Sequence, residues 1–525
     1  MEISTLESSL PNEVYDFIFL YLKSVDIIYS FFNLNDRFNH LIYPFLCAID
    51  LSDADEYSLN KYYQTILPKI HHYIKAIKVD DKNVDFVFPL SLYSKIYPNL
   101  ESVFITKIKK DGKYLSYLKL FKQLISLKID FDESEYQDTV SNELCSNLFQ
   151  SDCRLHTLVL DNVYLSINTH IIQLCFSIRN LTVQLHSLDK VYVLLNNLPS
   201  IEYVNIHMPP IRGQHHHQQQ QNDVEFNYDK NIPSTLSKLK HFVFSSEFSA
   251  NYDYLELLLS HCCPNLERLS VDLYSHEFID GERLEKKLLL KLTKLKVFHF
   301  CFRIPVLDNT LNIDDYIQTY KSSFWINNHH SILCFNQPLH NQYYCVFSLP
   351  YAFERLSCVT NDLVNYRSNV NDDISLYSNQ AKDIAFYDRV PFTLELFQII
   401  QKSCLKATGL TFIVASIRFF SDNLMNNELI LENIVDVWLF LDQLKYKYFR
   451  RLLLMTPNIL RLFIVESLLL DIISESQTKP NAFQELQSIC NPIRHVFIGR
   501  GAYEYDASKD NGRKLLFPNA ILSGW

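Results

Sequence analysis

The sequence predicts an α/β protein in which three N-terminal helices are followed by an irregular solenoid of parallel strands with helices on the outer side. Three observations predict this fold. Residues 10–46 carry apolar stripes at helical spacing. Beyond residue 70, a short apolar motif recurs at intervals within the range of about 20 to 50 residues typical of repeat proteins. Hydrophobic residues make up 48% of the chain and charged residues 21%, which is a globular composition.

The first predicted helix starts at Pro11, a residue that suits a first helical turn because its missing N–H would be unpaired there anyway. Phe19 and Leu20 lie off the main apolar stripe of this helix and require a second surface to cover them. We therefore expect the N-terminal unit to dock a partner. The stripe that we expect to face inward consists of Val14, Phe17, Ile18, Tyr21 and Leu22.

Two further short helices are predicted, with Ser24 and Asn35 as their N-caps, because each offers a side-chain oxygen to free N–H groups ahead of an apolar run. The second helix is expected to bury Ile27, Ile28, Phe31, Phe32 and Leu34. The third is expected to bury Phe38, Leu41, Ile42, Phe45 and Leu46.

This run resembles an F-box. The residues that carry the resemblance are Leu10-Pro11-x-Glu13-Val14, Tyr21-Leu22, Asp26 and Leu34-Asn35-x-Arg37-Phe38-x-x-Leu41. Phe38 stands where Trp is frequent in the family. The resemblance implies docking onto a Skp-type adaptor and, through it, onto a cullin scaffold of a ubiquitin ligase. The implied adaptor-binding residues are Leu10, Pro11, Val14, Phe19, Leu20 and Leu22. The alternative is a helical cap, with Phe19 and Leu20 packed against the first strand beyond it.

The recurring motif is apolar-x-x-apolar-x-apolar, often introduced by a Pro-Asn pair. Its alternating end predicts a strand, and helical stripes fill the intervals. The units resemble divergent leucine-rich repeats, best seen in Cys-Pro-Asn-Leu-Glu-Arg-Leu-Ser-Val at 263–271. The motifs begin at Leu100, Leu124, Leu155, Ile178, Ile201, Leu239, Leu266 and Leu295, and later at Ala381, Ala407, Ile434, Ile459 and Ile493.

We divide the chain into an F-box-like domain at 4–50, a repeat segment at 70–300, an aromatic-rich segment of strands at 301–378, a second repeat segment at 379–500 and a polar tail at 501–525. The run of His and Gln at 214–221 is interpreted as a solvated insertion; adventitious metal binding is the alternative.

Several classes of function are disfavoured. The net charge is −10 with scattered Lys and Arg, so we expect no nucleic-acid partner. No secretory signal or membrane-spanning run is predicted, and the 12 Cys show no disulfide or metal spacing, so we expect a reducing compartment, the cytoplasm or the nucleus. Only 8 Gly occur, and neither a cofactor motif nor a nucleophile elbow is present, so no enzymatic activity is expected.

Residues between the apolar positions of stacked strands line one surface, which in repeat proteins binds other proteins. The predicted substrate-binding residues there are Tyr203, His241, Arg268, His299, Arg461 and His495. We therefore predict a substrate receptor of a Skp-cullin-F-box ligase that captures a protein of unknown identity. The alternative is an interaction scaffold whose N-terminal helices cap the solenoid.

Overall fold

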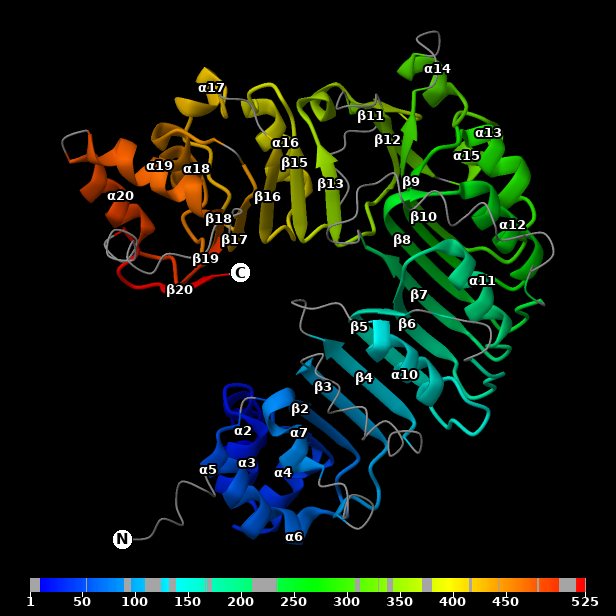
Figure 1. Cartoon of the computed structure of the whole chain (residues 1–525), viewed down its shortest axis with the longest axis vertical. Coiled ribbons are helices and arrows are strands. Elements are labelled where there is room, and N and C mark those ends of the chain that lie inside the picture. The colour runs from blue at the N-terminus through cyan, green and yellow to red at the C-terminus, as the bar shows by residue number, and fades with distance from the viewer. Residues whose placement is uncertain are drawn as a thin grey trace. The chain divides into compact units, whose positions relative to one another are not determined.

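The computed structural model describes residues 10–52, 54–88, 96–108, 124–131, 138–165, 167, 172–209, 233, 235–306, 312–328, 330–337, 343–370, 380–414, 418–441, 443–478, 481–499 and 516–524. The His and Gln run at 214–221 lies outside them. The fold is mixed α/β with mostly parallel strands, as predicted (Figure 1). One compact unit comprises Met1–Leu269 with Lys291–Lys296, and the other comprises Ser270–Leu290 with Val297–Trp525.

The first unit begins with three helices, α2 (Asn12–Phe19), α3 (Ser24–Phe31) and α4 (Asp36–Cys47). Asn35 is the N-cap of α4, since its side chain accepts a hydrogen bond from the Phe38 N–H at 3.0 Å. The prediction for Ser24 was wrong. Ser24 is the first residue of α3, and Lys23 holds the cap position without a side-chain cap bond.

Eight strands of the first unit pair in parallel and in chain order. They are β1 (Ala48–Asp50), β2 (Ala76–Asp80), β3 (Ser102–Ile108), β4 (Ser126–Phe131), β5 (Thr157–Leu165), β6 (Asn180–Leu185), β7 (Tyr203–Met208) and β8 (His241–Ala250). Strands β3 to β8 follow the six predicted motifs. Strands β1 and β2 were not predicted, although Ile49, Leu51, Ile77 and Val79 carry the same alternation.

Helices connect these strands: α5 (Glu56–Lys61), a π-helical turn at Tyr62–Ile66, α6 (Leu67–Ile70), α7 (Asp81–Val87), α10 (Asp138–Leu148), α11 (Leu188–Asn196) and α12 (Tyr252–Cys262). Leu188, Val191 and Leu195 lie on the buried side of α11, which contacts β6 and α12. Each connection therefore returns the chain to the start of the next parallel strand.

Apolar ladders across the strands form the core of this sheet. Val103, Leu127 and Leu158 are register partners on β3, β4 and β5, and all three are buried. Residues on either side of each are only half-buried. One face of the sheet is therefore covered, while the other presents its side chains partly to solvent.

The second unit contains β9 (Arg268–Ser275) from Ser270 onward. It also contains β10 (Val297–Pro305), β11 (Ser331–Gln337), β12 (Tyr343–Leu349), β13 (Arg355–Val359) and β14 (Arg367–Ser368). Short helices lie between these strands: α13 (Gly281–Arg283), a π-helical turn at Leu284–Leu289, α14 (Ile313–Gln318), α15 (Ser323–Asn327) and a 3-10 helix at Asn361–Asn365. Strand β12 pairs antiparallel with both β10 and β11. The predicted strands of 301–378 are thus present, but several are antiparallel.

The β11–β12 hairpin contributes to an apolar core. Phe335 and Phe347 lie on one face of the hairpin and belong to a core cluster that extends to Leu356 of β13 and Ile384. On β10, Arg303 is buried, makes an ion pair with Asp272 and lies over the Tyr274 ring, with 4.7 Å between Cζ and the ring centroid. This pairing compensates for the removal of the guanidinium from water.

A second sheet of parallel strands follows in the order β13, β15 (Asp383–Tyr387), β16 (Gly409–Val414), β17 (Asp436–Leu439), β18 (Arg461–Val465), β19 (His495–Gly499) and β20 (Ile521–Gly524). Its helices are α16 (Leu394–Ser403), α17 (Asp422–Met425), α18 (Tyr446–Met455), α19 (Glu466–Gln477) and α20 (Ala482–Cys490). The five motifs of the second repeat segment each form a strand. The prediction of a polar tail at 501–525 was wrong in part, because Leu516 and Phe517 are buried and β20 extends the sheet.

Candidate docking surface

The inner side of α2 is aromatic. Tyr15 and Phe19 lie one helical turn apart and are both buried. The Tyr15 ring lies edge-on to Phe38, with centroids 4.9 Å apart, and the Phe19 ring lies 5.1 Å from Phe31 and 5.6 Å from Phe45. Edge-to-face contacts of this kind stabilise packed aromatic side chains beyond the area that they bury. These rings hold α2 against α3 and α4.

The other side of α2 and the residues just after it are apolar and exposed. The largest exposed fractions are 60% for Phe17, 77% for Leu20 and 75% for Tyr21. The rings of Phe17 and Tyr21 contact each other edge-on, 5.5 Å apart. We call this set the α2 surface; it consists of Val14, Phe17, Ile18, Leu20, Tyr21 and Leu22.

The inward stripe predicted for the first helix was therefore wrong. Its members lie on the α2 surface, and the residues that face inward are Tyr15 and Phe19. Both stripes have helical spacing, so periodicity alone could not distinguish them. The aromatic pocket formed by α3 and α4 decided which stripe was buried, and α2 ends at Phe19, so residues 20–22 no longer follow the helical spacing. Leu34, which was expected to be buried, is also exposed.

Arg37 fixes the chain at the start of α2. Its guanidinium donates hydrogen bonds to the carbonyl of Leu10 and, at 2.8 Å, to the side-chain oxygen of Asn12, and it lies over the Tyr15 ring. These contacts hold the residues on either side of Pro11, which is exposed. The start of α2 is thus anchored on α4.

The six predicted adaptor-binding residues have different environments. Pro11, Val14, Leu20 and Leu22 are exposed, and Leu10 is half-buried. Phe19 is only 2% exposed and is unavailable to a partner in this conformation. Sequence reasoning missed Phe17, Ile18 and Tyr21 as surface residues because it assigned them to the core.

A pocket of about 300 Å³ lies beside the α2 surface, lined in part by Leu22, Asp26, Asp50 and Asp55. Burial raises the pKa of the Asp50 carboxyl, whereas hydrogen bonds from Lys78 and Ser52 lower it. The lowering outweighs the effect of burial, so this pKa lies below its ordinary value. The Lys78 ammonium lies 2.8 Å from the Asp50 carboxylate. The Asp50 carboxylate of this pocket therefore takes part in fixing β1 to β2.

The predicted substrate-binding residues lie in both units. In the first unit, Tyr203 and His241 are register partners on β7 and β8, with ring centroids 6.2 Å apart. Arg268, also in the first unit, is exposed at the start of β9. His299, which belongs to the second unit, is half-buried on β10. In the second unit, Arg461 and His495 are register partners on β18 and β19. Four of the six predicted residues are thus brought together, as two pairs.

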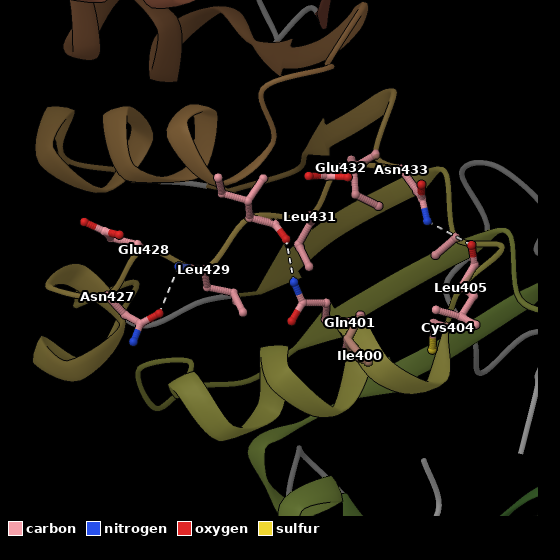
Figure 2. A pocket seen from close by; sticks show the side chains of 13 residues that line it. Ile400, Gln401, Cys404, Leu405, Asn427, Glu428, Leu429, Leu431, Glu432 and Asn433 are labelled. Atoms are coloured by element: carbon pink, nitrogen blue, oxygen red, sulfur yellow. Dashed lines mark hydrogen bonds between the residues drawn. The ribbon is translucent and has the colours of Figure 1, made fainter. Parts of the chain in front are cut away.

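A larger pocket, of about 670 Å³, lies between α16 and the chain segment 427–434 (Figure 2). The side-chain amide of Gln401 donates to the carbonyl of Ile430 at 2.7 Å, and that of Asn433 donates to the carbonyl of Leu405 at 3.0 Å. Asn427 accepts from the Leu429 N–H at 2.9 Å. The amides of its lining therefore hold the surrounding backbone, and the arrangement indicates a structural role.

No protein family model matches this chain, and no curated protein is significantly similar to it. Within the described ranges, no helix is both long and apolar enough to cross a membrane. In the same part of the chain, no group of three or more His, Cys, Asp or Glu side chains is placed to hold a metal ion.

Proposed function

We propose that this chain is the substrate-recognition subunit of a Skp-cullin-F-box type ubiquitin ligase, with an F-box at its N-terminus and a divergent leucine-rich-repeat body. The observation that carries the proposal is the α2 surface, where Phe17 on the helix and Leu20 and Tyr21 just after it are exposed, while buried rings hold the helix in place from behind. Large contiguous apolar patches on soluble proteins commonly mark sites of protein association.

The energetics of the α2 surface support docking. Full burial of a large apolar side chain stabilises a complex by about 1.5 to 3 kcal/mol. Several such side chains lie within three turns of chain here, next to the exposed Pro11 that the F-box resemblance assigns to adaptor binding. We propose that a Skp-type adaptor covers this surface and connects the chain to a cullin scaffold.

The proposed mechanism is proximity. The open sides of the sheets hold a protein substrate while other subunits of the ligase supply the ubiquitin-transfer chemistry, which becomes efficient when the reactants are held close together. We propose no catalytic activity, cofactor or metal for the chain itself. We propose a location in the cytoplasm or the nucleus, where such ligases act.

A binding assay with the purified chain and a Skp-type adaptor tests the proposal. Leu20→Asp and Phe17→Ser should each weaken adaptor binding by about tenfold or more, because each removes buried apolar area from the complex. Phe176→Ser is the matched control, because Phe176 is a phenylalanine of the first unit with the same 60% exposure as Phe17. Equal binding by all variants, or no binding by the wild type, would reject the F-box assignment.

The alternative function is an interaction scaffold that never joins a ligase. The observation in its favour is that α3 and α4 both contact the edge strand β1, with Ile27, Ile28 and Ile49 buried. The helices therefore cover a sheet edge that would otherwise be open to pairing with another chain, and such covering commonly prevents aggregation. In that case, substitutions on the α2 surface would leave every partner of the chain bound.

A further inference from the structure

Three aromatic rings form a ladder across neighbouring strands of the second sheet. Trp438, Phe463 and Phe497 are register partners on β17, β18 and β19. The Trp438 and Phe463 ring centroids lie 3.3 Å apart with planes 4° from parallel, and those of Phe463 and Phe497 lie 4.3 Å apart with planes 8° from parallel. We call these three residues the aromatic ladder.

The aromatic ladder lies on the open side of the sheet. Its three side chains are half-buried, whereas the residues on either side of each along the strands are fully buried. Helices α18, α19 and α20 contact one another, and α19 contacts β18. Figure 1 shows these helices together on one side of the strands. The exposed Ile413 of β16 continues the apolar character of the open side.

The stacking determines which part of the rings meets a partner. Because Phe463 is sandwiched between Trp438 and Phe497, both of its π-faces are occupied. Its ring edge is left for contacts above the sheet. Ring edges carry partial positive charge and favour the π-face of another aromatic ring or an electron-rich oxygen, whereas cations prefer the π-face.

Arg461 exposes its guanidinium beside the ladder. Arg461 on β18 makes two hydrogen bonds to Asp436 on β17, one of them 2.6 Å long. The Arg461 side chain is 52% exposed and the Asp436 side chain only 16%, so the cation faces solvent while the carboxylate is covered. His495 lies next to Arg461 in register. A guanidinium with this geometry suits a carboxylate ligand.

We propose that the aromatic ladder and Arg461 form the binding site for a peptide segment that combines aromatic and acidic side chains. Aromatic side chains of the segment place their π-faces against the exposed ring edges, and a carboxylate pairs with Arg461. The proposal states which class of peptide the second sheet binds. It rests on the proposed function only where it calls this peptide a substrate.

Fluorescence anisotropy with the full-length chain tests the proposal. One labelled probe is a short peptide in which glutamate alternates with phenylalanine, and the second has lysine in place of each glutamate. The glutamate peptide should bind about tenfold or more tightly than the lysine peptide, and Arg461→Gln should reduce this preference. Equal binding of both peptides, or no binding of either at about 1 mM, a Kd that corresponds to only about −4 kcal/mol, would overturn the proposal.

Two variants test whether the peptide binds at the aromatic ladder. Phe463→Ser should weaken binding of the glutamate peptide by about tenfold. Phe104→Ser is the matched control, since Phe104 occupies the same place on β3 in the first unit, half-buried, with Lys78 and Lys128 beside its ring. Unchanged thermal unfolding of both variants would show that they fold. If Phe104→Ser weakened binding as much as Phe463→Ser, the site would lie elsewhere.

Two further measurements separate the alternatives. Binding should change the emission of Trp438, and Trp438→Phe should abolish this change while the stack is kept; an unaltered change would overturn the proposal. A labelled oligothymidylate that bound more tightly than the peptide would assign the ladder to nucleic acid instead. Leu20→Asp should bind the peptide like the wild type, so failure of adaptor docking and failure of this site are distinguishable.

Discussion

The side-chain amide of Asn265 donates a hydrogen bond to the backbone carbonyl of Ser237 at 2.6 Å. Asn265 lies just before β9 and Ser237 just before β8, so the bond links two consecutive turns. The same bond joins Asn99 to His72 at 2.7 Å, and Asn458 to Glu432 at 2.8 Å. In these three turns, the Asn of the Pro-Asn pair thus holds the turn to the preceding one.

Replacing this Asn should destabilise the protein locally. Asn458→Ala leaves the Glu432 carbonyl without this donor, and we expect a loss of about 0.5 to 1.5 kcal/mol in the free energy of unfolding. Denaturant unfolding checks the prediction. Asn328→Ala is the control, because the Asn328 amide bonds Phe324 within its own helical turn. A similar loss in both variants would contradict a special role for the link between turns.

Phe19 and Phe17 should behave in opposite ways on substitution. Phe19→Ala removes a ring packed between Phe31 and Phe45 and should destabilise the N-terminal helices by about 3 to 5 kcal/mol. Phe17→Ala should change stability by about 0.5 kcal/mol or less, because the side chain is exposed. Hydrogen exchange of α2 to α4 measures both effects. Equal protection in the two variants would show that the rings are not packed as described.

Gly281 should tolerate no side chain. A Cβ at this position would lie 2.7 Å from the backbone carbonyl carbon of Thr319, and the Gly281 carbonyl accepts a hydrogen bond from the Trp325 indole at 3.2 Å. We expect Gly281→Ala to cost about 1 to 3 kcal/mol of stability, measured by thermal unfolding.

Gly409→Ala provides the comparison for Gly281→Ala. Its Cβ would lie 2.9 Å from the Asp383 carboxylate oxygen, which is the end of a side chain that can rotate away. This variant should be the milder of the two. If Gly409→Ala were the more destabilising, the backbone contact at Gly281 would not be the limiting one.

The contact between Lys78 and Asp50 should make stability depend on pH. The pKa of Asp50 is lowered in the folded state, so its contribution is present above the unfolded carboxyl pKa of about 3.9 and is lost as the pH falls through the folded value. Both side chains are partly exposed, so we expect Lys78→Gln to cost about 0.2 to 1 kcal/mol at neutral pH.

Acid unfolding of the wild type and Lys78→Gln checks this prediction. The difference between them should shrink progressively as the pH falls below about 4 and through the lowered folded pKa of Asp50, because protonation removes the carboxylate charge that Lys78 pairs with. It should also shrink in about 1 M salt, which screens exposed charges. A difference that persists under both conditions would show that Lys78 acts by packing instead.

The strands could be predicted from sequence because their signal is local. Leu127 and Ile129 alternate with half-buried neighbours on β4, and a similar alternation marks β17 and β18. The antiparallel direction of β11 and β12 could not be predicted, because an apolar run that is buried on both faces carries no sign of its partner's direction. The start of β1 was missed because it follows α4 without a turn.

The candidate sites depended more on tertiary structure. Arg461 and His495 were predicted to lie on the open face from their positions within the motifs, and the structure adds that they are register partners. The stacking of Trp438 on Phe463 was not predicted, since it needs the register of β17 against β18, which pairs residues 25 positions apart.

By itself, the sequence determined where most strands lie and that the N-terminal helices carry more apolar side chains than they can bury among themselves. Only the tertiary structure decided which of these side chains stay exposed. The reason is that the α2 stripes share one periodicity, and the pocket formed by Phe31, Phe38 and Phe45 accepts Tyr15 and Phe19. Packing between elements that are distant in sequence therefore determines which side of α2 is buried.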